Sequence, residues 1–443
     1  MTFQFVGRWF SKFDAQFNIQ PINKLDSRFR ACCRTNLCVL EINYETGASR
    51  VGYDMGSLNG PKFYAVVKKR HNNLYYRRLT MDKYIGFDID SNKTIACVVQ
   101  EGKKDRYTTI RTDIEHMKRF LREQQTPGEK LHLTFEISGE SGYRYDALAD
   151  CANEITVSNP TKMTWIYRTA KKNDRIDARK QAVLLSIGEI PKVHMPSKEV
   201  RQWRGTIQHR RKIVMTMTQV KNRIRALLKA NGLTKAAQRG SWWKIANRVW
   251  MRGLASACEV TAFELWRMSL ADLLDELELL ENQLKRITKY LDGYLESQPG
   301  GKLLMSIPGV GPRTAEAVLA YTDDISRFSR GKQYCAYFGL TPRLDESGSA
   351  KRLGHISKQG PSVVRWLVVE SAWRAIKKSP ALREFHQRVS SGQKARKKIA
   401  TVAVARKLLS IMRAMQNSGE LFNEELVCRE CGIGKVIKVK KLV

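Results

Sequence analysis

The sequence predicts an α/β domain with a mixed sheet, followed by a largely helical region. Short runs rich in β-branched residues lie between residues 84 and 111, and strands then alternate with helical patterns up to about residue 186. Beyond residue 195, apolar residues recur at helical and heptad spacing. The chain has 443 residues, which is long enough for two or three domains. We therefore expect an α/β domain joined to all-α parts.

The first 80 residues differ from the rest of the chain. They are basic, their apolar residues show poor periodicity, and they contain Cys32, Cys33 and Cys38. They are either a small basic appendage or upstream sequence translated in frame, with Met81 as the native start. We favour the second interpretation and expect little defined function there.

From residue 81 to 190 the pattern is regular. The expected strands span residues 84–88, 94–99, 106–111, 131–137 and 154–157, and the expected helices span residues 114–124, 143–153 and 174–186. Three strands in a meander followed by alternating helix and strand are the order of the ribonuclease-H-like fold.

Four carboxylates of this domain suggest a metal site. Asp88 ends the first strand, Glu136 lies near the end of the fourth, and Asp174 and Asp177 share one helix face. Ligands gather at such strand ends, and carboxylate oxygens suit Mg²⁺, which can activate a nucleophile at a phosphodiester. Alternatively, Asp174 is a helix N-cap and Asp177 an ordinary first-turn acid. Asp90 faces the same side as Asp88 and could be mistaken for it.

Two long helices are expected between residues 195 and 298. Heptad-spaced apolar residues are Val200, Trp203, Ile207, Val214, Met217, Ile224 and Leu228 in the first, and Leu270, Leu273, Leu277, Leu280, Leu284, Ile287, Leu291 and Tyr294 in the second. An antiparallel hairpin within one chain and a coiled coil between protomers both satisfy this spacing. Trp242, Trp243 and Trp250 lie between the helices, where a packed corner is favoured over base stacking.

The chain is strongly basic, with 78 Lys and Arg against 43 Asp and Glu, a net charge of +35. Nucleic acid is the expected partner, and an anionic membrane surface is the weaker alternative. No apolar run approaches the roughly 18 residues of a membrane span, so we expect no membrane insertion. The outer face of the first long helix is expected to follow a phosphate backbone. Its basic residues are Arg201, Arg204, Arg210, Arg211, Lys212, Lys221, Arg223, Arg225 and Lys229.

The region 299–412 contains two further motifs. Gly309 and Gly311 form a helix–glycine turn–helix pattern, typical of a helix-hairpin-helix that binds phosphate, although a plain helical corner fits as well. Residues 339–360 read as a polar, flexible loop in which a serine hydroxyl could attack phosphorus beside Lys351, Arg352, His355 and Lys358. On composition alone, a phosphate-binding loop without a nucleophile is favoured.

Residues 413–443 are expected to form a basic, mobile tail. The nine cysteines of the chain are scattered and odd in number, which indicates free thiols in a reducing compartment. Cys428 and Cys431 have the spacing of a zinc knuckle but no second pair nearby, so whether they bind a metal stays open.

Taken together, these motifs resemble the DEDD-type insertion-sequence transposases, the family numbered one hundred and ten, also described as bridge-RNA-guided recombinases. The resemblance covers about residues 82–412, in the family's order. The matching segments are Gly86-Phe87-Asp88-Ile89, Phe135-Glu136-Ile137-Ser138-Gly139, Asn159-Pro160, Asn173-Asp174-Arg175-Ile176-Asp177-Ala178, Lys221-Asn222-Arg223-Ile224, Ile307-Pro308-Gly309-Val310-Gly311, Gly339-Leu340-Thr341-Pro342, Ser347-Gly348 and Gly354-His355-Ile356-Ser357-Lys358. Residues 1–80, the segment Glu140-Ser141-Gly142, the Trp-rich insert and the Cys428–Cys431 tail depart from the pattern.

The resemblance implies a RuvC-like domain whose acids, here Asp88, Glu136, Asp174 and Asp177, bind Mg²⁺. It also implies a C-terminal transposase domain whose serine, here Ser347, becomes covalently linked to DNA. A non-coding guide RNA would pair with donor and target DNA, and a homodimer or homotetramer would join the acids of one protomer to the serine of another. Such a protein would work in the prokaryotic cytoplasm, at the nucleoid.

We therefore expect a DNA transposase with a RuvC-like catalytic domain over 81–190, a coiled-coil or helical hairpin over 195–298 and a transposase domain over 299–412. The expected nucleic-acid contacts are Arg210, Arg211, Lys212, Lys221, Arg223, Gly309, Gly311, Lys351, Arg352 and Lys358. Two alternatives are a RuvC-like metal-dependent nuclease that leaves Ser347 idle, and a catalytically dead nucleic-acid-binding protein, which the intact acids oppose.

Overall fold

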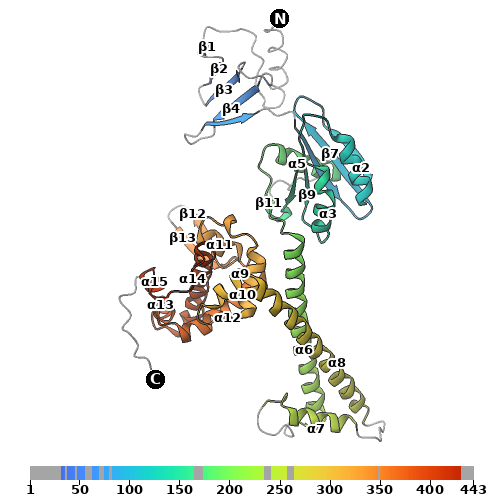
Figure 1. Cartoon of the computed structure of the whole chain (residues 1–443), viewed down its shortest axis with the longest axis vertical. Helices are drawn as coiled ribbons and strands as arrows, with labels where there is room; N and C mark the ends of the chain where they lie inside the picture. The colour runs from blue at the N-terminus through green and yellow to red at the C-terminus, as the bar shows by residue number, and fades with distance from the viewer. Residues whose placement is uncertain are drawn as a thin grey trace. The chain divides into compact units, whose positions relative to one another are not determined.

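The computed structural model describes residues 31–34, 37–44, 47–54, 62–68, 74–78, 82–163, 173–233, 241–256, 264–347 and 350–430. These residues fall into two compact units, Met1–Met195 and Pro196–Val443. Figure 1 labels their helices and strands. In the described ranges, none of the helices combines the length and the apolar character that crossing a membrane requires.

The N-terminal strands form a sheet of their own. They are β1 (Ala31–Arg34), β2 (Leu37–Tyr44), β3 (Gly47–Asp54), β4 (Lys62–Lys68) and β5 (Leu74–Arg78). Each strand pairs antiparallel with the next, in the order β1-β2-β3-β4-β5. This five-stranded antiparallel meander was not expected, because the apolar residues of the segment show poor periodicity. Residues 1–30, at the start of the expected basic extension, lie outside the described residues.

The second sheet confirms the predicted mixed α/β class. Its strands are β6 (Lys83–Ile89), β7 (Lys93–Gln100), β8 (Arg106–Arg111), β9 (Leu131–Glu136), β10 (Glu154–Ser158) and β11 (Lys192–Val193). The order is β11-β10-β9-β6-β7-β8. β6 and β9 pair in parallel, as do β9 and β10, whereas β6–β7, β7–β8 and β10–β11 are antiparallel. β6 therefore lies inside the sheet, between β9 and β7.

Helices cover both faces of this sheet (Figure 1). On one face, α2 (Ile114–Gln124) and α3 (Ser141–Leu148) enclose a core that includes Phe87 and Phe135. The helix expected over 143–153 ends early, because a 3₁₀ turn over Ala149–Cys151 follows α3. On the other face, α5 (Asp174–Ser186) packs against β6, β7 and β9.

The contact between α5 and β6 depends on Gly86. A methyl group on Gly86 would overlap the carbonyl oxygen of Ala178 and lie 2.8 Å from the backbone nitrogen of Ala182. The two backbones therefore meet without a side chain between them. This close approach sets the height and the position of α5 on the sheet.

The second unit begins with a helical hairpin within one chain, of α6 (Lys198–Ala230), α7 (Ile245–Ala255) and α8 (Trp266–Ser297) (Figure 1). Its core contains Ile213, Met217, Val220, Ile224 and Leu228 of α6 and Leu270, Leu273, Leu274 and Leu277 of α8. The predicted core position Val214 is wrong, because its side chain is 43% exposed. The buried stripe of α6 runs through Arg210, Ile213 and Val220 instead.

The packed corner at the tryptophans is confirmed, because Trp242, Trp243 and Trp250 pack against this core.

The remaining elements form a helical domain with one β-hairpin. They are α9 (Pro299–Met305), α10 (Pro312–Thr322), α11 (Gly331–Tyr337), β12 (Pro342–Ser347), β13 (Ala350–Ile356), α12 (Ser362–Lys378), α13 (Pro380–Ser390), α14 (Lys397–Ser418) and α15 (Glu424–Glu430). Their apolar side chains share one core that also includes Trp203 and Leu291.

The boundary expected at residue 412 is wrong, because α14 continues to Ser418 and the chain then packs back on the domain. The Glu424 carboxylate accepts hydrogen bonds from the Ser379 hydroxyl (2.6 Å) and the Ala381 backbone N–H (2.8 Å), at the start of α13. Val427 and Cys428 are buried in the same core. Residues 431–443, which include Cys431, lie outside the described residues.

We predict that Gly86→Ala lowers the free energy of opening α5 from the sheet by about 1–3 kcal/mol, because the added methyl group overpacks a backbone contact. Amide hydrogen exchange across β6 and α5 measures this. Gly205→Ala is the matched control. Gly205 lies in α6, where a methyl group meets no atom within 4 Å. That change should raise helix stability by about 0.5–1 kcal/mol. Unchanged exchange in Gly86→Ala would contradict the prediction.

Candidate functional site

Two of the predicted acids lie on neighbouring parallel strands. The last paired residues of β6 and β9 are Phe87 and Phe135, so Asp88 and Glu136 follow at the same level of the sheet. Phe87 and Phe135 point into the core beneath α2. Because side chains alternate along a strand, Asp88 and Glu136 face the opposite side, which α5 covers. Both acids are half-buried.

The other two acids lie in the first turn of α5. Asn173 is the N-cap, since its side chain accepts a hydrogen bond from the Arg175 N–H, so the alternative interpretation of Asp174 as the cap is wrong. Asp174 and Asp177 are half-buried. Ala178, the residue after Asp177, lies against Gly86, two residues before Asp88. The N-terminal turn of α5 therefore lies at the end of β6 that carries Asp88.

A lysine lies among these acids. The Lys93 Nζ is 3.0 Å from a carboxylate oxygen of Asp174. The hydrogen bond and charge of Asp174 raise the pKa of Lys93, and the charges of Asp90 and Asp88 add to this effect. Asp88, Asp90 and Asp174 are thus close enough to act on one ammonium group. Asp177 has a looser partner, Lys180, at 3.8 Å.

The chemistry of these residues suits a hard divalent cation, because carboxylate oxygens are the ligands that Mg²⁺ prefers. Strand register and the α5 contact bring Asp88, Glu136, Asp174 and Asp177 to the same end of β6 and β9. We call this end of the sheet the acid edge. Within the described part of the chain, however, no three His, Cys, Asp or Glu side chains are arranged so as to hold a metal ion. The Asp174 carboxylate is engaged with Lys93. The convergence of all four acids on a cation therefore stays a prediction.

Ser347 belongs to the second unit, where the structure corrects the expected flexible loop. β12 and β13 form an antiparallel hairpin, and Ser347 is the last residue of β12, opposite Ala350. Backbone pairing along the hairpin, such as Leu344 with Leu353, orders a segment whose Ser, Gly and Lys content suggests a loop. Gly348 and Ser349 lie outside the described residues. Gly354 and His355 are exposed on β13, and Lys358 is exposed just beyond the hairpin.

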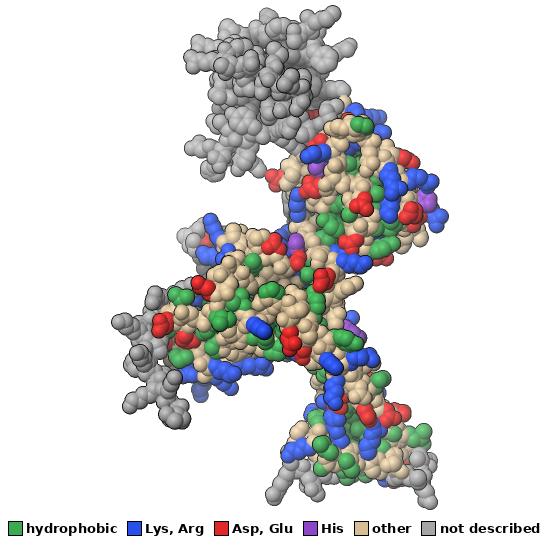
Figure 2. Space-filling view, in the orientation of Figure 1, with side chains coloured by type: hydrophobic (Ala, Val, Ile, Leu, Met, Phe, Trp, Pro, Cys, Tyr) green, Lys and Arg blue, Asp and Glu red, His purple; other side chains and the backbone are tan. Residues whose placement is uncertain are grey.

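The structure separates the expected phosphate contacts of α6 into two groups. Lys212, Arg223 and Arg225 are exposed, whereas Arg210 is 8% exposed and forms an ion pair with the buried carboxylate of Glu316. The prediction that Arg210 contacts phosphate is therefore wrong in this fold, because its guanidinium is needed to neutralise Glu316. Figure 2 shows Lys and Arg side chains along the helical hairpin.

Several exposed or half-exposed cations of α6 have partners within the unit. Arg211 donates to the Ser362 hydroxyl at 3.1 Å, and Arg223 lies 3.3 Å from Glu276. Lys221 and Arg225 lie over the ring of Trp243, 5.2 and 5.4 Å from its centre. These contacts hold the helices together and leave Lys212 as the least engaged of the expected contacts on this helix.

The two glycines of the expected phosphate-binding turn differ. Gly309 has a positive φ of 91°, and a methyl group there would lie 2.5 Å from the backbone nitrogen of Ala375 in α12. This glycine is therefore required for two protein backbones to pack, and its expected role as a phosphate contact stays a prediction. Gly311, the N-cap of α10, has open space around its Cα.

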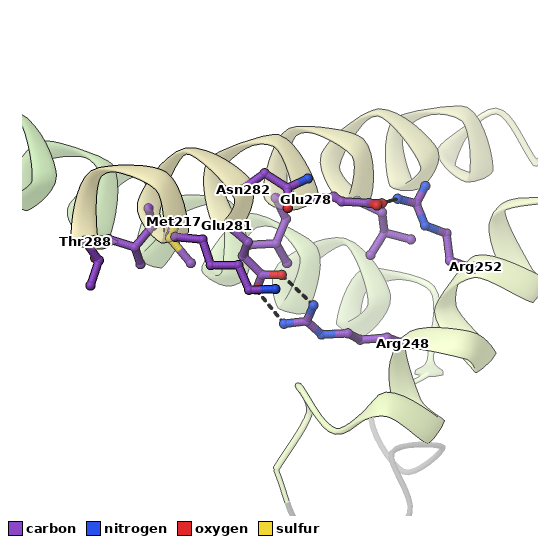
Figure 3. A pocket seen from close by; sticks show the side chains of 11 residues that line it. Met217, Arg248, Arg252, Glu278, Glu281, Asn282 and Thr288 are labelled. Carbon is purple, nitrogen blue, oxygen red and sulfur yellow. Dashed lines mark hydrogen bonds and ion pairs between the residues drawn. The ribbon is translucent and has the colours of Figure 1, made fainter. Parts of the chain in front are cut away.

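A cavity of about 730 Å³ lies between α6, α7 and α8, and none of the predicted site residues lines it, although Lys221 lies 3.9 Å from Glu281 in its wall (Figure 3). Its wall contains Met217, Leu274 and Leu277, and ion pairs cross its rim. Arg248 donates two hydrogen bonds, of 2.5 and 2.6 Å, to the Glu281 carboxylate. This pairing lowers the pKa of Glu281. The charged groups here fasten α7 to α8.

Sequence reasoning missed two residues near the acids, Lys93 and Gln181. Lys93 immediately follows a turn and carries no motif. Gln181 is the fourth residue after Asp177 and shares its helix face, so helical spacing alone could have identified it. The side chain of Gln181 is fully buried.

Two family profiles match this chain. A DEDD-type transposase profile matches residues 85–231, and the profile described as "Transposase IS116/IS110/IS902 family" matches residues 301–387. The chain is 27% identical to a probable family 20 transposase of Pseudomonas aeruginosa, over 62% of this chain and 79% of that protein. It is 30% identical to the transposase for insertion sequence element IS1111A of Coxiella burnetii, over 46% and 55%. It is 31% identical to a pilin gene-inverting protein of Moraxella lacunata, over 28% and 39%.

We predict that Arg210→Met lowers the free energy of unfolding of the second unit by about 3 kcal/mol, because Glu316 is left buried without its main partner. Chemical denaturation followed by tryptophan fluorescence measures this, since Trp203 packs in the same core. The matched control, Lys212→Met on the exposed face, should change stability by less than about 0.5 kcal/mol. The double variant Arg210→Met/Glu316→Leu should recover most of the loss, and equal effects of both single variants would contradict the prediction.

Proposed function

This chain carries the transposase domains of the IS116/IS110/IS902 insertion-sequence family, and we propose that it breaks DNA by attack of the Ser347 hydroxyl on a phosphodiester. We propose that Asp88, Glu136, Asp174 and Asp177 hold the Mg²⁺ that this reaction needs. The observation that carries the acid site is the register of β6 and β9, which brings Asp88 and Glu136 to one level beneath the first turn of α5.

The acid edge is suited to a cation for electrostatic reasons. Carboxylates gathered at one sheet edge repel one another unless a positive charge lies between them. Lys93 supplies part of that charge through its 3.0 Å contact with Asp174. In the proposed site the Asp174 carboxylate turns towards Asp177, and another cation then replaces the positive charge of Lys93 beside it. When bound, Mg²⁺ would polarise the phosphoryl oxygen and stabilise charge on the entering and leaving oxygens.

Ser347 provides the covalent step. Its hydroxyl oxygen forms a bond to phosphorus and loses its proton to a base, while one bond from phosphorus to a deoxyribose oxygen breaks. The leaving oxygen takes up a proton and departs as a hydroxyl. The number of phosphate ester bonds does not change, so a reverse attack by a sugar hydroxyl rejoins DNA without ATP. Lys351, Arg352 and Lys358 follow Ser347 on the hairpin and just beyond it, where their charges would balance the negative phosphorane.

We further propose that the protein binds donor and target DNA together with a non-coding guide RNA. The net charge of +35 favours polyanions, and Lys212 keeps an exposed cation on α6. The acids and Ser347 belong to different compact units. An assembly of two or four chains, in which the acids of one protomer meet Ser347 of another, is consistent with that separation.

We predict that Asp88→Asn lowers the rate of DNA strand cleavage by about 100-fold or more while nucleic-acid binding stays nearly unchanged, because a neutral amide cannot replace a charged ligand. Cleavage of labelled DNA in Mg²⁺ and a parallel filter-binding titration measure the two effects. Asp90→Asn tests the neighbouring acid and should keep most activity. Asp150→Asn, an exposed acid after α3, is the neutral control. Full cleavage by Asp88→Asn would contradict a metal role for Asp88.

We predict that Ser347→Ala abolishes the covalent protein–DNA adduct, because alanine has no hydroxyl to attack phosphorus. A denaturing gel with labelled DNA, guide RNA and Mg²⁺ detects the adduct. Ser349→Ala, two residues further along, is the matched control and should keep at least part of it. An adduct that persists in Ser347→Ala excludes this serine as the nucleophile. Wild-type cleavage that yields only free ends would favour a metal-dependent nuclease that hydrolyses DNA without the serine.

A further inference from the structure

Gln181 is a buried amide without an evident structural role. Its side chain is fully buried in α5, and neither the Oε1 nor the Nε2 has a hydrogen-bond partner within the described part of the chain. Buried polar groups are nearly always paired, and leaving both ends of an amide unpaired disfavours the folded state. An apolar side chain of the same size would pack there at lower cost, so the amide needs an explanation.

The helix geometry directs this amide towards the acids. Gln181 follows Asp177 by four residues and Asp174 by seven, so the three side chains share one face of α5. Helical side chains lean towards the N-terminus of their helix. The Gln181 amide therefore extends back towards Asp177, at the end of α5 where the acids gather.

The neighbours of α5 show which side of β6 Gln181 occupies. Ala178 and Ala182 lie directly over Gly86. On one flank, the Arg179 Nε donates to a carboxylate oxygen of Asp105 at 2.6 Å, in the connection between β7 and β8. Gln181 lies on the opposite flank of the helix, which faces β9.

Beneath that flank lies a second unpaired polar group. Thr134 of β9 is the register partner of Gly86, and its side chain is fully buried. Its Oγ1 also has no hydrogen-bond partner among the described residues. Glu136 follows two residues later on the same face of the strand. Gln181 on α5 and Thr134 on β9 thus lie on facing surfaces of the helix and the sheet, on the flank that also carries Glu136 and Asp177.

We propose that Gln181 and Thr134 are positioning residues for the divalent cation, forming a neutral polar floor beneath Asp88, Glu136 and Asp177. This inference rests on the proposed function. An amide can donate a hydrogen bond to a carboxylate and accept one from water, and a hydroxyl can do both. Mg²⁺ keeps several of its waters in protein sites. The floor orients the carboxylates and holds that water without adding charge, as outer partners of metal ligands do.

A purely structural role for the two side chains makes the opposite prediction. If they only fill space, the isosteric variants Gln181→Met and Thr134→Val should bind cations as the wild type does. If they form the floor, both variants should fold as stably as the wild type in EDTA, or more stably, yet bind the cation more weakly. Stability and cation affinity therefore move in different directions.

The test is a titration of the full-length protein with MnCl₂, followed by isothermal calorimetry and by the thermal unfolding midpoint. We expect Gln181→Met and Thr134→Val each to weaken Mn²⁺ binding by about 10-fold or more. Thr134→Ser, which keeps the hydroxyl, should stay within about threefold of the wild type. The midpoints of Gln181→Met and Thr134→Val in EDTA should not fall. Wild-type Mn²⁺ affinity in both Gln181→Met and Thr134→Val would overturn the inference.

Asp88→Asn separates this inference from the proposed function. One outcome is that the wild type binds Mn²⁺, Asp88→Asn does not, and Gln181→Met and Thr134→Val bind it normally. In that case the proposed acid site stands, and the proposed role of Gln181 and Thr134 is wrong. If the wild type does not bind Mn²⁺, or Asp88→Asn binds it equally well, the proposed site fails and the floor fails with it. Should Gln181→Met not fold, the comparison of Thr134→Val with Thr134→Ser decides alone.

Discussion

The contact between the backbones of α5 and β6 at Gly86 determines the geometry of the acid edge. Because no side chain separates the two elements, the first turn of α5 must lie beside the end of β6 that carries Asp88. Asn173 fixes the residue at which the helix begins. A shift of one residue in that start would rotate Asp177 by about 100° around the helix axis. The four acids are thus placed by two paired strands and one tightly packed helix, which is a stiffer support than loops would provide.

The charge of the chain serves two different purposes. Some cations neutralise buried or partly buried carboxylates, as Arg210 does for Glu316 and Arg248 for Glu281. The partly buried guanidinium of Arg204 instead donates to the carbonyl oxygens of Ala320 and Tyr321 near the end of α10. These residues contribute to the net charge of +35 but are already engaged inside the fold. The charge available to a polyanion is therefore a smaller, exposed set, and overall basicity alone overstates the interface.

Local signals made much of the α/β domain predictable. The predicted helices at residues 114–124 and 174–186 match α2 and α5, because Asp113 and Asn173 cap them through short-range hydrogen bonds. The positions of Asp88 and Glu136 near the ends of their strands could be predicted from the sequence in the same way. The β12–β13 hairpin was not, because its stability comes from pairing across strands rather than from residue type.

Long-range partners limit what could be predicted at individual site residues. Arg210 has the appearance of a surface cation until Glu316, more than one hundred residues away, is placed beside it. Gly309 carries the same signal whether its neighbour is a phosphate or the backbone of Ala375. Gln181 belongs to no motif, and only its complete burial without a partner draws attention to it.

The return of Glu424 to the start of α13 affects the order in which the chain can become compact. The core of the C-terminal domain includes side chains from Trp203 to Cys428, so it can close only after residue 428 has been synthesised. The core that supports the acid edge is complete by Met195. During vectorial synthesis the acid-bearing unit can therefore fold early, while the helices around Ser347 wait for their last partner. Until then their apolar faces are open to chaperones and to aggregation.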